Sequence, residues 1–229
     1  KRRTRISCFL LAGLLGLTSC GSPSSASLRE ETSVEEALGG EISSVKEEGL
    51  IYQGSMELSY AENFSVDYYQ EGIRGLTTMD GTKLLVIPLG VETPEGVSED
   101  WILLKQPVEN LYLVSSAVMD MFQSLDALSA IGFSSQKAEG WYVASARKAM
   151  EEGNILYAGK YNKPDYELIV SKGCSLAIEN RMVTHSPEVK EMLESFGIPV
   201  MIEYSSAEAH PLGRVEWIKF FGALVGKEE

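Results

Sequence analysis

The segment from Ser186 to Ile202 most narrowly limits the folds open to this chain, because it encodes a capped helix followed at once by a buried strand. Ser186 can accept a hydrogen bond from the free N–H groups of a helix that begins at Pro187, a residue suited to the first helical position. One apolar face follows from the helical spacing of Val189, Met192, Leu193 and Phe196. Gly197 can end this helix in the left-handed conformation, and Ile198–Ile202 is then a short apolar strand covered on both faces.

A second apolar run, SLAIEN at residues 175–180, precedes this helix, so the order is strand, helix, strand. Such βαβ units build parallel sheets. The same rhythm begins at Leu111, where LYLVSS predicts a strand and the following residues to Leu128 predict a helix. Residues 111–204 are therefore predicted to form a central, mainly parallel sheet flanked by helices.

The residues before Leu111 indicate a different kind of sheet. Apolar and polar residues alternate around Phe64, Val66 and Tyr68, which places those three side chains on one face of a strand. Asp80-Gly81 joins two further apolar runs and is a strong hairpin signal. The predicted fold class is α/β, with a small N-terminal antiparallel β region followed by the mainly parallel sheet.

The first twenty residues indicate export from the cytoplasm. Four basic residues among the first five are followed by an uncharged apolar core, and the sequence Leu17-Thr18-Ser19-Cys20 follows that core. This pattern is typical of a secretory signal, and its apolar core is shorter than the ~20 residues that span a bilayer. The junction resembles the lipobox of bacterial lipoproteins, which implies that Cys20 is lipidated and becomes the first residue. The alternative is an ordinary signal peptide with an incidental cysteine.

Charge and cysteine content exclude some classes of protein. Removal of the four basic residues before Cys20 takes the net charge from −13 to −17, which excludes general nucleic-acid binding. Cys174 would then be the one cysteine left without a lipid, so no disulfide is available within the exported chain. The predicted organisation is a signal peptide at 1–19, a lipidated cysteine and flexible acidic linker at 20–55, and a folded region at 56–229.

The order of elements from Leu111 to the C-terminus resembles one family. The runs PDYELIVSKG, SLAIEN, SPEVKEMLESFGIPVMIEY and HPLGRVEWIKFFGALVG are similar to the N-terminal lobe of the substrate-binding proteins of iron-complex and cobalamin ABC importers. The resemblance implies a lipid-anchored receptor, without enzymatic activity or cofactor. Its partners would be an iron chelate, haem or corrinoid as ligand, a membrane permease, and the membrane itself through the lipid.

In this family the final helix continues into a second lobe, and the ligand lies between the two lobes. The chain ends soon after the predicted helix at 213–226, so the resemblance implies a truncated product or a single-lobe form. The apolar side chains on this helix would then lack part of their cover. They are Val215, Ile218, Phe221, Ala223, Leu224 and Val225. We expect such a chain to bind ligand weakly and to self-associate.

Ligands of open α/β sheets bind beyond the carboxyl ends of the strands. Hydroxyl, phenol, amide and guanidinium groups at these ends suit an oxygen-rich or carboxylate-bearing chelate. The candidate ligand-binding residues are Ser115, Ser116, Tyr161, Asn180, Arg181, Tyr204 and Ser205. Solvated loop residues without a ligand are the alternative for each of them.

Other polar residues have structural explanations. Glu188 is favoured at a helix N-terminus, although the resemblance also implies an acidic residue near this place that contacts the permease. Arg214 and Glu216 are predicted to hold the start of the final helix. His185 and His210 are predicted loop residues, since no spacing typical of a metal site surrounds them.

Two other functions are open at this point. A surface lipoprotein that scavenges ligand or binds partners without a permease would have the same sequence features. A secreted enzyme is the third alternative, but GxSxG, SxxK and HExxH motifs are all missing from the sequence.

Overall fold

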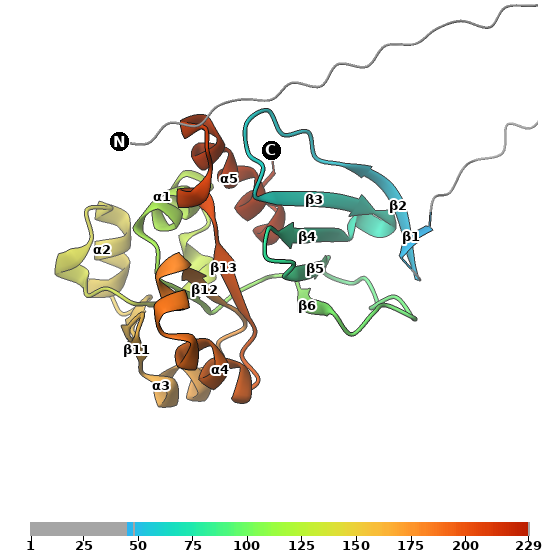
Figure 1. Ribbon diagram of the computed structural model, residues 1–229. Helices are drawn as coiled ribbons and strands as arrows, with labels where there is room; N and C mark the ends of the chain where they lie inside the picture. Colours follow the sequence, from blue (N-terminus) through green and yellow to red (C-terminus); the bar gives the residue numbers. More distant parts are fainter. Residues whose placement is uncertain (1–44, 48, 229) are drawn as a thin grey trace, which may run out of the picture. The chain divides into compact units, whose positions relative to one another are not determined.

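Two β-sheets and a long C-terminal helix organise the chain in the computed structural model, which describes residues 45–47 and 49–228 (Figure 1). The signal segment, Cys20 and most of the expected linker lie outside these residues. Within the described residues, no helix combines the length and the apolar character needed to cross a bilayer.

The first sheet has the strand order β1-β2-β3-β4-β5-β6. Neighbouring strands are antiparallel except for β5 and β6, which run parallel. The strands are β1 (Val45–Glu47), β2 (Leu50–Ser55), β3 (Phe64–Tyr69), β4 (Arg74–Thr78), β5 (Lys83–Ile87) and β6 (Trp101–Lys105). A short 3₁₀ helix, η1 (Gln70–Gly72), connects β3 to β4.

The sheet begins earlier than the sequence analysis expected. The linker was predicted to extend to residue 55, but β2 already pairs with β3 from Tyr52 onward. Leu50, the first residue of β2, is buried, whereas the other five residues of the strand are exposed or half-buried, so one buried side chain and a ladder of backbone hydrogen bonds hold the strand in place. The Asp80-Gly81 hairpin is confirmed: Gly81 has φ +86°, and the Asp80 carboxylate accepts hydrogen bonds from Thr78 Oγ1 and the Thr82 N–H.

The second sheet is entirely parallel, as expected, with the order β13-β12-β7-β8-β9. Its strands are β7 (Leu111–Leu113), β8 (Ile131–Ser134), β9 (Leu156–Tyr157), β12 (Ala177–Asn180) and β13 (Val200–Glu203). The helices are α1 (Ser116–Ser124), α2 (Ala144–Glu151), α3 (Tyr166–Ser171), α4 (Pro187–Ser195) and α5 (Pro211–Val225). Between them lie the small ladder β10 (Gly159–Lys160) and β11 (Lys163–Pro164), and the 3₁₀ helices η2 (Leu128–Ala130), η3 (Ala138–Gly140), η4 (Arg181–His185) and η5 (Ser205–Ala207).

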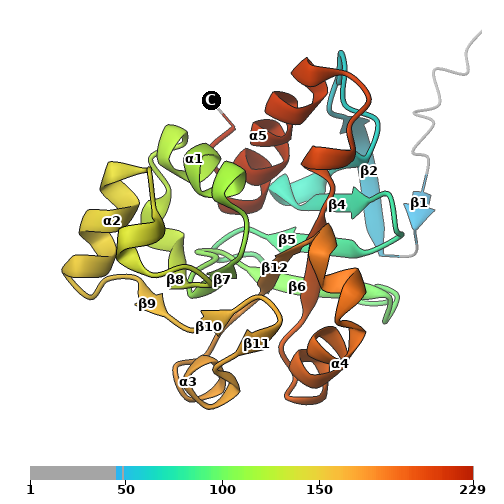
Figure 2. The same ribbon diagram turned by 60° about the vertical axis from the view of Figure 1, so that its left-hand side comes forward.

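Helices cover both faces of the parallel sheet (Figure 2). Successive strand residues face opposite sides, so Tyr112 and Ala177 pack with α3 and α4, whereas Leu113 and Ile178 pack with α1, α2 and α5. Gly197 ends α4 with φ +76°, as predicted. Ser186 occupies the position before α4, but its side chain makes no capping hydrogen bond, so the predicted cap is wrong in that detail.

Helix α5 joins the two sheets, and its apolar side chains are mostly covered. Trp217 and Phe220 lie edge-on to Phe64 of the first sheet, with ring centroids 4.9 and 5.4 Å away. On the other side Phe221 lies 5.4 Å from Phe122 of α1. The expected exposed apolar face is therefore much reduced, because the first sheet supplies the cover; Val215 remains 62% exposed.

Two carboxylates attach the loop before β3 to the start of α5. Glu216 accepts hydrogen bonds from the backbone N–H groups of Ser59, Tyr60 and Ala61 at 2.8–3.1 Å, and one from Lys219 at 2.8 Å. Burial raises its pKa, but these hydrogen bonds outweigh burial and lower the pKa of Glu216 to about 2. The prediction that Glu216 holds the start of this helix is confirmed in a form that the sequence did not show.

Glu208 makes the neighbouring contact in the same way. Its carboxylate accepts hydrogen bonds from the N–H groups of Glu62 and Asn63 at 3.0 and 3.1 Å and from the Trp217 indole at 2.8 Å. Gly213 allows the close approach, because a Cβ there would lie 2.8 Å from the Tyr60 carbonyl oxygen. The loop and the helix therefore fold as one unit.

We predict that Glu216→Gln lowers the free energy of unfolding by about 1.5–3 kcal/mol, because an amide offers one acceptor oxygen without charge to several donors. The loss should be largest above pH 4.5 and should shrink as the pH falls from 4.5 toward 2, since the carboxylate stabilises the fold only when ionised. Urea unfolding at several pH values measures it. Glu194→Gln, which removes one exposed pair with Lys190, is the matched control. Equal midpoints for both variants would contradict the assigned role of Glu216.

Candidate functional site

The strand order places a topological switch point between β7 and β12. The chain leaves β7 toward β8 and β9 on one side and returns later to β12 and β13 on the other. The loops that follow β7 and β12 therefore diverge at the carboxyl edge of the sheet, which is where ligands of open α/β sheets bind.

A cavity of about 470 Å³ lies at this edge, and we call it the lysine hollow. It is lined by Val114, Ser135, Gln136, Lys137, Gly140, Tyr157, Lys160, Tyr161 and Asn180. These residues come from the ends of β7, β8, β9 and β12 and from the β10–β11 ladder. Ligand sites of open α/β sheets lie at such places, where several strand ends converge on one cavity.

The lysine hollow is positively charged on a protein with a net charge of −13. Lys137 and Lys160 line it, and within the described part of the chain its lining includes no carboxylate. The Lys137 ammonium lies 5.8 Å from the centroid of the Tyr157 ring, which is within cation–π range. Since Tyr157 lines the cavity, this contact places the positive charge at the cavity wall. The site can therefore attract and hold an anion.

Two further cavities continue from the lysine hollow along α1. The first, which we call the tryptophan hollow, measures about 600 Å³, is lined by Trp141, Tyr142 and Ser116 among others, and shares Gln136 and Gly140 with the lysine hollow. The second measures about 350 Å³ and lies between α1 and α5, where Ser205, Arg214 and Val215 line it. The three cavities form a series because each shares residues with the next.

The structure brings only some of the sequence-predicted residues to these cavities. Tyr161 and Asn180 line the lysine hollow, and Ser116 lines the tryptophan hollow. The Asn180 side-chain oxygen accepts a hydrogen bond of 2.9 Å from the Met182 N–H. Its amide nitrogen, which makes no hydrogen bond to the described residues, is the group left to meet a ligand.

Other predicted residues are engaged in the fold. Ser115 is buried before α1 and lines none of the three cavities. The Tyr204 hydroxyl donates to Asp80 at 3.2 Å and so joins the parallel sheet to the hairpin of the first sheet. Ser205 lines the cavity between α1 and α5, but its hydroxyl and N–H both donate to Glu203. Arg181 is exposed outside the three cavities, and Glu188 is exposed in the first turn of α4.

The two lysines that give the site its charge were not predicted as ligand-binding residues. Lys137 stands three residues beyond the end of β8, and Lys160 stands next to the predicted Tyr161. Their places after two consecutive strands were a usable signal. Neither lysine was among the predicted ligand-binding residues, because hydroxyl, phenol, amide and guanidinium groups were preferred. His185 ends η4, so the prediction that it is a loop residue is wrong, whereas His210 lies in the loop before α5, as predicted, and caps that helix by accepting a 3.1 Å hydrogen bond from the Leu212 N–H.

An unusual buried pair lies next to the site, on the face of the sheet covered by α3 and α4. Glu179 precedes Asn180 and is 0% exposed, and burial raises the pKa of its carboxyl group to about 8. Both carboxyl oxygens of Glu179 and the buried hydroxyl of Tyr112 lack a hydrogen-bond partner among the described residues. Glu179 is therefore protonated at neutral pH.

We predict that stability falls as the pH rises from 4.5 to 8, because Glu179 holds its proton in the folded state and loses it in the unfolded chain. The slope approaches about 1.4 kcal/mol per pH unit at most. Glu179→Gln should flatten the profile in this window, whereas the exposed control Glu194→Gln should leave it unchanged. Urea unfolding followed across this window tests the prediction, and an equally steep profile for Glu179→Gln would contradict it.

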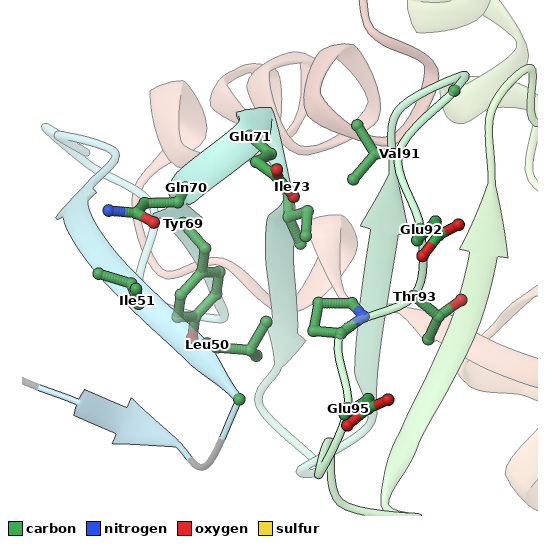
Figure 3. A pocket seen from close by; sticks show the side chains of 13 residues that line it. Leu50, Ile51, Tyr69, Gln70, Glu71, Ile73, Val91, Glu92, Thr93 and Glu95 are labelled. Carbon is green, nitrogen blue, oxygen red and sulfur yellow. The ribbon is translucent and has the colours of Figure 1, made fainter.

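A separate cavity of about 590 Å³ lies on the first sheet (Figure 3). Leu50, Tyr69 and Ile73 form its apolar wall, and carboxylates come from Glu71, Glu92 and Glu95. These acidic groups would repel an anion. In residues 45–47 and 49–228, no group of three or more His, Cys, Asp or Glu side chains is placed to hold a metal ion. The lysine hollow is therefore the stronger candidate site.

Comparison with known proteins finds distant relatives. No protein-family model matches the chain. Two proteins of Methanocaldococcus jannaschii, each described as an uncharacterized lipoprotein, are similar at 21% identity over 198 residues and 27% identity over 172 residues. The matches cover 75% and 73% of this chain but 46% and 43% of those proteins. The chain thus spans about half the length of the curated relatives that it resembles.

Proposed function

We propose that this protein is a lipid-anchored, extracytoplasmic solute receptor that binds an anionic metal chelate in the lysine hollow and delivers it to an ABC permease. It acts as a binding protein rather than an enzyme, and its ligand class is an iron chelate, haem or a corrinoid. The observation that carries the proposal is the presence of Lys137 and Lys160 in a cavity that reaches the topological switch point of a protein with net charge −13.

The anchor is supported by two independent facts. Cys20 follows a signal-like apolar segment, and the relatives are named lipoproteins. A negatively charged domain has little affinity for anionic lipid, so attachment would depend on the acyl chains of Cys20.

We predict that Cys20→Ala releases the protein from the membrane fraction when it is expressed with its signal segment. Removal of the lipid removes the acyl chains that hold the protein at the bilayer. Fractionation followed by mass spectrometry of the N-terminal peptide measures both steps. Cys174→Ala is the control and should remain in the membrane fraction. An unmodified Cys20 in the membrane-bound protein would defeat the proposal.

The ligand assignment is tested by titration of the full chain with ferric citrate, haemin and cyanocobalamin. Lys137→Ala and Lys160→Ala should each weaken binding of the anionic chelates by about 1.5–3 kcal/mol, the value of a lost hydrogen bond to a charged group. Lys148→Ala is the matched control, because this lysine is exposed and paired with Glu152 away from the cavity. Unchanged affinity in both hollow variants would place the site elsewhere.

The same titration separates the sequence-based candidates from those that the structure favours. Asn180→Ala and Tyr161→Ala should weaken binding, since both residues line the lysine hollow. Tyr204→Phe should alter stability before affinity, because its hydroxyl is bound to Asp80. Arg181→Ala tests how far the site extends. If it weakens ligand binding as much as Lys160→Ala does, the site extends beyond the lysine hollow.

Glu188 is proposed as the contact with the permease. It is exposed at the start of α4, and α4 stands beside the strand ends without contributing to the hollow. Glu188→Lys should reduce uptake in cells while leaving ligand affinity unchanged, whereas Glu194→Lys at the other end of α4 should preserve both. Normal uptake by Glu188→Lys would favour a scavenging lipoprotein that works without this contact.

A further inference from the structure

Tyr142 is far more exposed than any other aromatic side chain among residues 49–228. It is 99% exposed, compared with 45% for Tyr60 and 49% for Phe196. Tyr60 is stacked on His210 with centroids 4.6 Å apart, and Phe196 contacts Tyr166. Within the described chain Tyr142 contacts no other ring. Almost the whole phenol ring is therefore accessible to a ligand.

The backbone that carries Tyr142 is firmly held. The preceding residue, Trp141, is 1% exposed, and its indole N–H donates to Ser134 Oγ at 3.0 Å. Arg147 of α2 donates to the Trp141 carbonyl oxygen at 2.6 Å. Tyr142 therefore projects from a fixed point between the sheet edge and α2. An exposed ring on a rigid base loses little conformational entropy when it binds a partner.

Tyr142 also lines a cavity. It forms part of the wall of the tryptophan hollow, which is about 600 Å³ in volume. Gln136 and Gly140 line both this hollow and the lysine hollow, so the two cavities are neighbours. A ligand that fills both cavities would meet two lysines at one end and, at the other, the exposed ring of Tyr142, with Asp120 also in the lining.

We infer that the ligand of this site is an anion that carries a flat aromatic ring. Its negative groups bind at Lys137 and Lys160, and its ring stacks on Tyr142 in the tryptophan hollow. This inference rests on the proposed anion site and adds a selectivity that charge alone does not provide. Tyr142 is thus a specificity-determining residue, because stacking distinguishes a flat ring from a saturated one of equal size and charge.

Two matched dianions test the inference on the full chain. Phthalate and cis-cyclohexane-1,2-dicarboxylate carry the same charges on rings of similar size, and only phthalate is aromatic. Dissociation constants come from NMR titrations that follow the indole N–H of Trp141, which lies in the wall of the hollow. We expect phthalate to bind about three- to tenfold more tightly than its saturated counterpart.

The variants then identify the source of that preference. Tyr142→Ala should bind both dianions equally, whereas Tyr142→Phe should keep the preference, because a phenyl ring still stacks. Both substitutions change an exposed side chain, so the fold is retained. Equal binding of the two dianions by the wild-type chain, with loss on Lys160→Ala, would overturn the inference and leave the proposed anion site standing. If neither dianion binds, the result overturns the inference about the aromatic ring and also the proposed anion site.

Discussion

The contact between two carboxylates and five consecutive backbone N–H groups holds this structure together. Glu216 binds the N–H groups of Ser59, Tyr60 and Ala61, and Glu208 binds those of Glu62 and Asn63. Such hydrogen bonds to charged acceptors are about twice as strong as neutral ones. Because this loop leads into β3, the contact sets where the first sheet meets α5. The aromatic cluster of Phe64, Trp217 and Phe220 can then pack.

The candidate site depends indirectly on the contact between the first sheet and α5. Helix α5 packs on α1 through Phe221 and Phe122, and α1 supplies residues to the tryptophan hollow and to the cavity beside it. The hydrogen bond from Tyr204 to Asp80 adds a second link between the sheets. The first sheet thus acts as a support for the parallel sheet, while Lys137 and Lys160, the groups proposed to bind an anion, lie beyond the carboxyl ends of β8 and β9.

The parallel sheet could be predicted from the sequence because its strands are continuous apolar runs, and its helices show clear periodicity and end at residues such as Gly197. The lysine hollow could be predicted only in part. Strand ends locate Asn180 and Tyr161, but whether Tyr204 faces a cavity or another sheet depends on a partner 124 residues away, Asp80. The role of Glu208 was hidden for the same reason, and the sequence did not show which backbone N–H groups Glu216 binds. Acidic residues in a helical segment look like solvated surface until the donors that meet them are known.

The distance along the chain between the partners of this central contact has a consequence for biogenesis. Ser59 and Glu216 are separated by 157 residues, so the acceptor is synthesised long after the donors have emerged. Until then, Phe64 and Val66 of the first sheet have no helix to cover them. Contacts between such distant residues form slowly, because a long loop must close before any of them contributes. If the chain were exported unfolded and folded only after crossing the membrane, the first sheet would not form in the cytoplasm without the helix that covers its apolar face.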